Sequence, residues 1–196
     1  MDIAAGTGGF VINGQAANDQ SGFSVASAGD VNGDGLADLI VGASLSDPAA
    51  GTDAGRSYVV FGQSSGRAIE LSTIAGGTGG FVINGQASGD KSGVSVASAG
   101  DFNGDARSDL VLQNDSGALA FWLMNGTTLS LGRESYLLPS TWRLTGAGNF
   151  AEPQRNYLVF QNLADGSVAF WKMDGTTVIE GTLPYVISTD WKIAAP

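Results

Sequence analysis

The stretch Asp30-Val-Asn-Gly-Asp-Gly-Leu-Ala-Asp38 decides the fold, because it places oxygen-bearing side chains at positions 1, 3, 5 and 9 of one short loop. Asp30, Asn32 and Asp34 can each direct an oxygen inward, and Asp38 can complete the shell. Leu36, at position 7, can offer its main-chain carbonyl. All five are hard oxygen ligands, which suit Ca²⁺ best. The loop is therefore a candidate calcium site.

The residues around this loop favour strands over helices. An EF-hand needs a carboxylate at position 12 and a helix on each side, but position 12 here is Val41. The flanks, residues 23–28 and 38–43, are short and rich in residues that favour strands. Gly33 and Gly35 allow the positive φ angles that a tight wrap requires. We therefore expect a nine-residue calcium loop that joins two strands.

The loop and its flanks together, residues 22–43, resemble the FG-GAP repeat. That repeat builds the β-propeller of integrin α subunits and of many bacterial surface proteins. The resemblance covers about twenty consecutive positions, including every ligand position of the loop. It implies a propeller blade with Ca²⁺ bound between the first two strands.

Composition excludes several classes of function. The 196 residues carry a formal net charge of −10, which argues against a nucleic-acid partner, since phosphates require a basic surface. The chain has no histidine and no cysteine, which excludes Ser-His-Asp triads, Cys-His pairs and the usual zinc sites. Paired carboxylates could serve a glycosidase, but the clustered acids belong to the loops. We therefore expect no enzyme activity.

Internal repetition sets the architecture. Residues 6–15 recur almost unchanged as residues 77–86, and Asp30 recurs as Asp101, a period of 71 residues. Thirty glycines indicate many turns. In the first unit we expect strands at residues 23–28, 38–43, 56–61 and 81–83, with an exposed loop at 46–55. Four such strands make one propeller blade.

A second loop, residues 101–109, keeps every ligand type of the first. Its expected ligands are Asp101, Asn103, Asp105, the carbonyl of Arg107, and Asp109. Ala106 replaces the glycine found at position 6 of the first loop. A non-glycine residue in a left-handed conformation costs about 1 kcal/mol, so we expect weaker calcium binding here.

Beyond the second loop the repeat becomes shorter. Residues 110–128 are echoed by residues 158–177, and Trp122 and Trp171 are 49 residues apart. This unit resembles the VCBS-type repeat of bacterial secreted proteins. Its loop, residues 149–157, has Ala151, Pro153 and Tyr157 where the ligands stood, so we assign no metal there.

We therefore predict an all-β chain, residues 1–196, that forms a β-propeller segment. The expected parts are residues 6–93 with an outer strand and the first long repeat, a second blade at 94–138, a third at 139–184, and the start of a fourth unit at 185–196. Isolated strands are expected at 10–12 and 191–194. Complete propellers have about four to eight blades. Three blades predict an incomplete ring, a segment of a longer propeller, or a ring completed by self-association.

Two aromatic pairs, Phe121-Trp122 and Phe170-Trp171, allow two interpretations. Aromatic side chains on a rigid face could stack on sugars. A repeated pair more often places one ring in the core between blades and one outward, and we favour this interpretation. Trp142 and Trp191 precede the loop position and are also expected to pack.

The sequence favours a calcium-binding module that contacts an extracellular protein or glycan, as in adhesion. Ca²⁺ would stabilise the loops between strands; a direct bridge from the ion to an acidic partner is the alternative. Two further hypotheses stay open: a lectin-like appendage of a secreted hydrolase, and a truncated or engineered repeat without a ligand. We expect a location outside a bacterial cell or on its surface, although no signal peptide and no transmembrane segment is recognisable.

Overall fold

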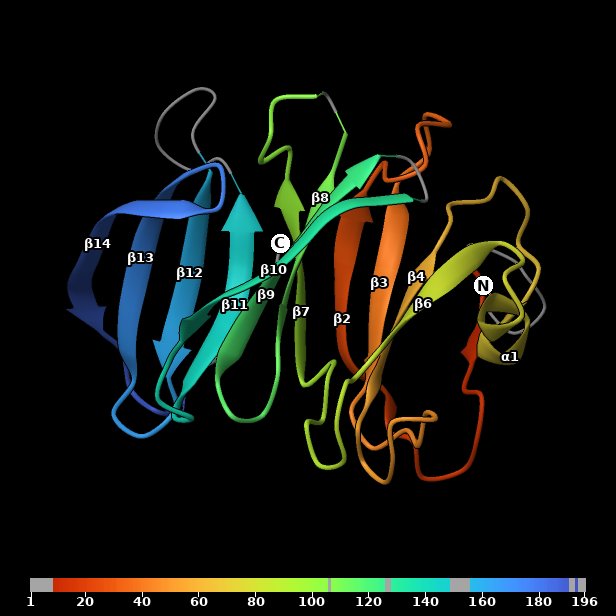
Figure 1. The fold of residues 1–196 in the computed structure, drawn as a ribbon, viewed down its shortest axis with the longest axis horizontal. Helices are drawn as coiled ribbons and strands as arrows, with labels where there is room; N and C mark the ends of the chain where they lie inside the picture. Colours follow the sequence, from red (N-terminus) through yellow and green to blue (C-terminus); the bar gives the residue numbers. More distant parts are fainter. Residues whose placement is uncertain (1–8, 106, 126–127, 149–155, 191–192, 194–196) are drawn as a thin grey trace.

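Three four-stranded antiparallel sheets make up most of the computed structural model, which describes residues 9–105, 107–125, 128–148, 156–190 and 193 (Figure 1). Blade 1 contains β2 (Ser21–Gly29), β3 (Asp38–Ala43), β4 (Arg56–Val60) and β6 (Gly80–Asn84). Blade 2 contains β7 (Ser95–Gly100), β8 (Asp109–Gln113), β9 (Ala118–Asn125) and β10 (Thr128–Leu137). Blade 3 contains β11 (Trp142–Gly148), β12 (Tyr157–Asn162), β13 (Ser167–Asp174) and β14 (Thr177–Val186). The expected all-β fold of four-stranded blades is confirmed.

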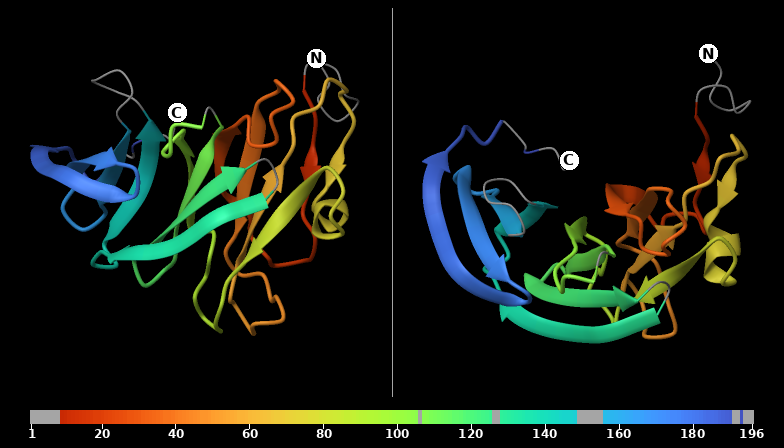
Figure 2. Two further views of the ribbon diagram at one scale, coloured as in Figure 1. Left: turned by 45° about the horizontal axis from the view of Figure 1, so that its top comes forward. Right: turned by 90° about the horizontal axis from the view of Figure 1, so that it is seen from above.

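The blades lie side by side along an open arc (Figure 2). Their first strands are neighbours, with β7 in contact with β2 on one side and β11 on the other. The second strand of blade 2, β8, reads Asp-Leu-Val-Leu-Gln and is buried at every position. A continuous buried run of this kind is expected where both faces of a sheet are covered. The strand sequences thus reflect the stacking of sheet on sheet.

Apolar side chains fill both interfaces between blades. Ile40 and Val59 of blade 1 pack with Leu110 and Leu112 of blade 2. The interface of blades 2 and 3 is built in the same way from the following residues: Val111, Leu119, Phe121, Leu144, Leu158, Phe160 and Met173. Alternate residues of blade 2 therefore face opposite neighbours, because successive side chains of a strand point to opposite faces.

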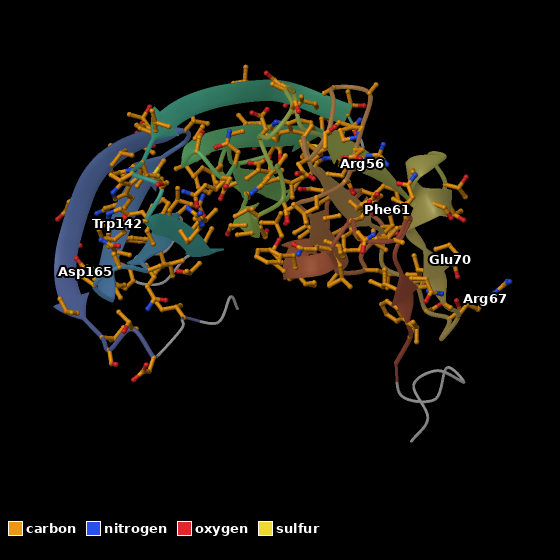
Figure 3. All side chains as sticks on the ribbon, turned by 90° about the horizontal axis from the view of Figure 1, so that it is seen from below. Arg56, Phe61, Arg67, Glu70, Trp142 and Asp165 are labelled. Carbon is orange, nitrogen blue, oxygen red and sulfur yellow. The ribbon has the colours of Figure 1, made fainter. Side chains whose placement is uncertain are left out.

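The outer face of blade 1 is covered by a segment that sequence analysis did not predict. β5 (Ile69–Glu70) and helix α1 (Leu71–Ala75) lie between β4 and β6, and Leu71 and Ile74 pack on Val41 and Tyr58. Figure 3 shows Arg67 and Glu70 at this end of the arc. The strand expected at residues 10–12 is observed as β1 (Ile12–Asn13), which pairs in parallel with β5. It therefore belongs to this covering layer.

The connection between β3 and β4 differs from the exposed loop expected at residues 46–55. Ser46 and Ala54 are fully buried and Pro48 is buried, so the exposed residues of the segment are Asp47, Ala49, Ala50 and Thr52. Gly55 and Ser92 form an isolated parallel bridge, which brings the end of this loop against the start of blade 2. The loop is thus part of the contact between blades.

The strand expected at residues 191–194 lies outside the described residues except for Ile193. Within the described ranges, the arc does not close into a ring (Figure 2). Phe170 lies on the face of blade 3 that corresponds to the Phe121 face of blade 2. Phe121 is buried and Phe170 half-buried, since no described blade covers that face. Among the described residues, no helix is long and apolar enough to cross a membrane.

A buried glutamine joins blade 2 to blade 3. Gln113 is fully buried, its Nε2 donates to the Trp142 carbonyl at 3.0 Å, and its Oε1 accepts from the Leu144 N–H at 2.8 Å. The equivalent Gln161 of blade 3 accepts from the Ile193 N–H at 3.2 Å. Gln113 therefore ties the end of β8 to β11, and Gln161 ties β12 to the chain at Ile193.

We predict that Gln113→Leu lowers the free energy of unfolding by about 1–3 kcal/mol, because it leaves buried main-chain groups of β11 without partners. Gln86→Leu is the control, since Gln86 is exposed and its side chain has no hydrogen-bond partner among the described residues. Urea denaturation of both variants measures the difference. Equal stabilities would show that the Gln113 hydrogen bonds contribute nothing to the interface.

Candidate functional site

The first loop, residues 30–38, is organised by hydrogen bonds from its own backbone to its acidic side chains. Asp30 Oδ1 accepts from the N–H groups of Gly33 at 2.7 Å and Asp34 at 3.1 Å, and its Oδ2 accepts from Gly35 at 2.9 Å. Asp34 Oδ1 accepts from the Leu36 N–H at 2.8 Å. Gly33 and Gly35 have φ angles of 80° and 85°, as the sequence predicted for a tight wrap. The backbone thus curls around the carboxylate of its first residue.

Asp38 closes this loop from a fully buried position. Its Oδ2 accepts from the Val31 N–H at 2.9 Å, and its Oδ1 accepts from the Gly62 N–H at 2.8 Å. Val31 itself is fully buried in the core between blades 1 and 2. One carboxylate therefore connects the start of the loop, the start of β3 and the chain that leaves β4.

The second loop, residues 101–109, repeats this arrangement. Asp101 Oδ1 accepts from the N–H groups of Gly104 and Asp105, at 2.6 and 3.0 Å. Buried Asp109 accepts from Phe102 at 2.7 Å and from Met124 at 2.8 Å, and Phe102 packs in the core as Val31 does. In each loop the asparagine amide donates to the acid two positions later, at 2.9 Å in the first loop and 3.1 Å in the second. Ala106 lies outside the described residues.

Burial raises the pKa of the Asp38 and Asp109 carboxyl groups. In both cases the main-chain hydrogen bonds oppose this shift, whereas a neighbouring acid, Asp34 or Asp105, adds to it. Among the described residues, neither carboxylate has an ion-pair partner. An ionised carboxylate in such a place is unfavourable, and a nearby cation would reduce its energy.

The donor chemistry of both loops fits a hard cation, and the backbone already wraps as such a site requires. The expected carboxylate, amide and carbonyl oxygens lie within one nine-residue turn. In the described part of the chain, however, no three acidic side chains converge on a point that could hold a metal ion. A carboxylate oxygen that accepts one N–H keeps a second lone pair, so these hydrogen bonds and metal ligation are compatible.

The third loop lies mostly outside the described residues, which resume at Asn156. Position 9 is Tyr157, so blade 3 has no counterpart of the buried aspartate. The Met173 N–H, which corresponds to Met124 of blade 2, donates to the Asn156 carbonyl at 2.8 Å. A main-chain carbonyl thus takes over one of the hydrogen bonds that Asp109 makes.

Residues that sequence analysis passed over connect one loop to the next. A Cβ atom on Gly29, directly before the first loop, would collide with the Ser108 side chain of the second loop. Gly100 stands in the same relation to Asn156, whose Nδ2 donates to the Asp101 carbonyl at 2.7 Å. The eighth position of the second and third loops therefore packs on the glycine that precedes the loop of the blade before it. Only the packing of blades shows this contact.

The side chain of Arg107 also reaches the first loop. A Cβ atom on Gly33 would lie 3.6 Å from Arg107 Nη1. Arg107 was expected to supply a main-chain carbonyl to the second loop, so one residue lies at both candidate sites. The two loops therefore form a continuous rim.

The aromatic pairs divide between packing and partial exposure. Phe121 is buried between blades 2 and 3, and Trp171 and Trp142 pack against the same core, as expected. Figure 3 shows Trp142 at the blade 3 end of the arc. Trp122 is half-buried against the core of blades 1 and 2 and borders a hollow there. Trp191 lies outside the described residues.

Comparison with known families assigns residues 21–60 to the FG-GAP repeat. The match contains the first loop and the first three strands of blade 1, and it confirms the resemblance expected from residues 22–43. FG-GAP repeats are generally non-catalytic binding modules. No curated protein matches the chain.

We predict that Gly29→Ala destabilises the chain more than Gly22→Ala does. Both glycines lie in β2 with positive φ, 69° and 86°, so each alanine adds backbone strain of about 1 kcal/mol. Only at Gly29 does the new Cβ meet another loop, since nothing lies within 4 Å of a Cβ on Gly22. Such a clash adds about 1–3 kcal/mol.

The double variant Gly29→Ala/Ser108→Gly separates the two effects. Removal of the Ser108 side chain should restore the part of the free energy of unfolding that Gly29→Ala loses to the clash. It should leave the free energy of unfolding of Gly22→Ala unchanged, as measured by urea denaturation. If Ser108→Gly restored no more stability to Gly29→Ala than to Gly22→Ala, the contact between the two loops would be refuted.

Proposed function

We propose that the chain is a calcium-stabilised propeller module that binds a protein or glycan partner outside the cell. One observation carries the calcium part: two loops with the same set of oxygen donors share one hydrogen-bonded frame. Each is closed by a buried aspartate that has no ion-pair partner among the described residues. A bound Ca²⁺ ion would supply the positive charge that these carboxylates lack.

The residues that would hold calcium are the same in kind at both loops. In the first they are Asp30, Asn32, Asp34, the Leu36 carbonyl and Asp38. In the second they are Asp101, Asn103, Asp105, the Arg107 carbonyl and Asp109. The backbone N–H groups already orient the first, third and fifth side chains of each loop, so on binding the acidic side chains would have to converge while the loop backbone keeps its wrap.

The role as a binding module rests on the FG-GAP match and on the framework of sheets. Loops at the ends of rigid strands are the usual place of recognition. The net charge of −10 disfavours nucleic acid as the partner. As an extracellular module, the chain is expected to bind calcium with a Kd of about 10⁻⁴–10⁻³ M.

We predict that Ca²⁺ raises the thermal stability of the chain relative to a chelator, with two ions bound per chain in calorimetry. An ion at about 100 times its Kd adds about 2.7 kcal/mol per site. Asp34→Ala and Asp105→Ala should each remove one ion, and the double variant should remove the calcium response. Asp190→Ala, an exposed acid outside the loops, should retain both ions.

The same variants measure the two sites separately. In Asp34→Ala only the second loop can bind calcium, and in Asp105→Ala only the first can. The Kd of the second loop should be about five-fold higher than that of the first, because Ala106 replaces glycine. Equal affinities would refute this role of Ala106. Absence of bound ions in the native chain, with no change in stability, would refute the calcium proposal.

A further inference from the structure

A small hollow of about 60 Å³, partly open to solvent, lies between blades 1 and 2. It is at the strand ends opposite the calcium loops, where β6 and β8 end and β9 begins. The lining consists of Ile83, Asn84, Gly85, Gln86, Asp90, Ser92, Leu112, Asn114, Ala118, Ala120 and Trp122. The indole of Trp122 therefore borders a space with an amide- and carboxylate-bearing rim.

The neighbouring interface shows why this space is open. Between blades 2 and 3, the ring of Tyr136 stacks edge-on against Trp171, with ring centres 5.3 Å apart. Strand registers place Ile83 of blade 1 at the position of Tyr136, and Trp122 at that of Trp171. The isoleucine is shorter than the tyrosine, so among the described residues no ring takes the place of Tyr136 against Trp122.

The outer face of blade 1 shows what would fill the rest of the space. There Gln15 Oε1 accepts from the Tyr58 hydroxyl at 2.6 Å and from Arg56 Nη1 at 2.7 Å. Gln86 is the repeat equivalent of Gln15, and Ala120 and Ala118 stand where blade 1 has Tyr58 and Arg56. Figure 3 shows Arg56 at the blade 1 end.

The Gln86 side chain consequently lacks the hydroxyl that its counterpart binds. Among the described residues, it has no hydrogen-bond partner. Asn114 uses its Oδ1 to accept from Ala118 and Ser116, which leaves its amide N–H groups as donors. The hollow thus offers donors and acceptors to a hydroxyl-bearing molecule that enters where Tyr58 stands in blade 1.

We propose that this hollow binds a neutral sugar residue of a glycan. A pyranose has an apolar C–H face, which matches the indole of Trp122, and hydroxyl groups, which match Gln86, Asp90 and Asn114. The Asp90 carboxylate and the negative net charge disfavour acidic sugars. The inference rests on the proposed role as a binding module and names its ligand class, but it does not require calcium.

The test uses the full chain and calorimetric titration with the methyl glycosides of glucose, galactose, mannose, N-acetylglucosamine and N-acetylneuraminic acid. At least one neutral glycoside should bind at one site per chain. Ile83→Tyr, which fills the hollow as Tyr136 fills its own interface, should weaken that binding at least ten-fold. Ile179→Tyr is the matched control on exposed β14 and should bind as the native chain does.

Gln86→Ala tests the polar rim and, because Gln86 is exposed, keeps the fold if Ile83→Tyr does not. It should also weaken binding at least ten-fold. Absence of neutral glycoside binding at millimolar concentration, binding of the acidic glycoside alone, or unchanged affinity in both variants would overturn the proposal. Calcium-dependent stability without glycoside binding would refute this site alone, whereas glycoside binding with no calcium response would refute the calcium proposal alone.

Discussion

The buried aspartate at the ninth position of a loop is the interaction on which the first two blades depend. Asp38 accepts hydrogen bonds from Val31 and Gly62, which are far apart in sequence, and thereby fixes the corner where three strands of blade 1 meet. Asp109 does the same in blade 2. Hydrogen bonds from buried N–H groups to a carboxylate are stronger than those to a neutral oxygen, but burial of the charge opposes them. This conflict between geometry and charge is what a cation would resolve.

Neighbouring blades are joined by two different kinds of contact. At the junction of blades 1 and 2, Gly42 allows the chain before β7 to approach so closely that a Cβ would collide with the Gly93 carbonyl. At the equivalent position of blade 2, Gln113 reaches β11 with two hydrogen bonds. The change coincides with the shift from the longer repeat to the shorter one. The two repeat types therefore differ in how they join to the next blade, while the four-stranded sheet is common to both.

The strands and the oxygen donors could be predicted from the sequence because both are local patterns. The loop ligands recur at fixed spacing, and the strands beside them are short runs of β-forming residues. Helix α1 could not be predicted, because a helix of five residues shows no periodicity and because residues 62–79 have no counterpart in the shorter repeat. The partners of Asp38 at Gly62 and of Gly29 at Ser108 could not be predicted either, since these contacts arise only when strands and blades are packed. The oxygen donors could be predicted from the sequence, but the hydrogen bonds and packing contacts that hold them in place could not.

A repeat protein acquires a site where one copy of the repeat omits what another copy contains. Tyr136 and Trp171 close one interface, and Tyr58 with Gln15 closes the outer face of blade 1. Between them, an isoleucine and two alanines leave an indole and a glutamine exposed to a shared hollow. The four-stranded sheet is the same in each blade, so the hollow forms without a change in the backbone. Because the walls belong to two blades, their spacing depends on the contacts at the opposite rim, where Gly29 meets Ser108. The loops and the hollow are thus two ends of one interface between blades 1 and 2.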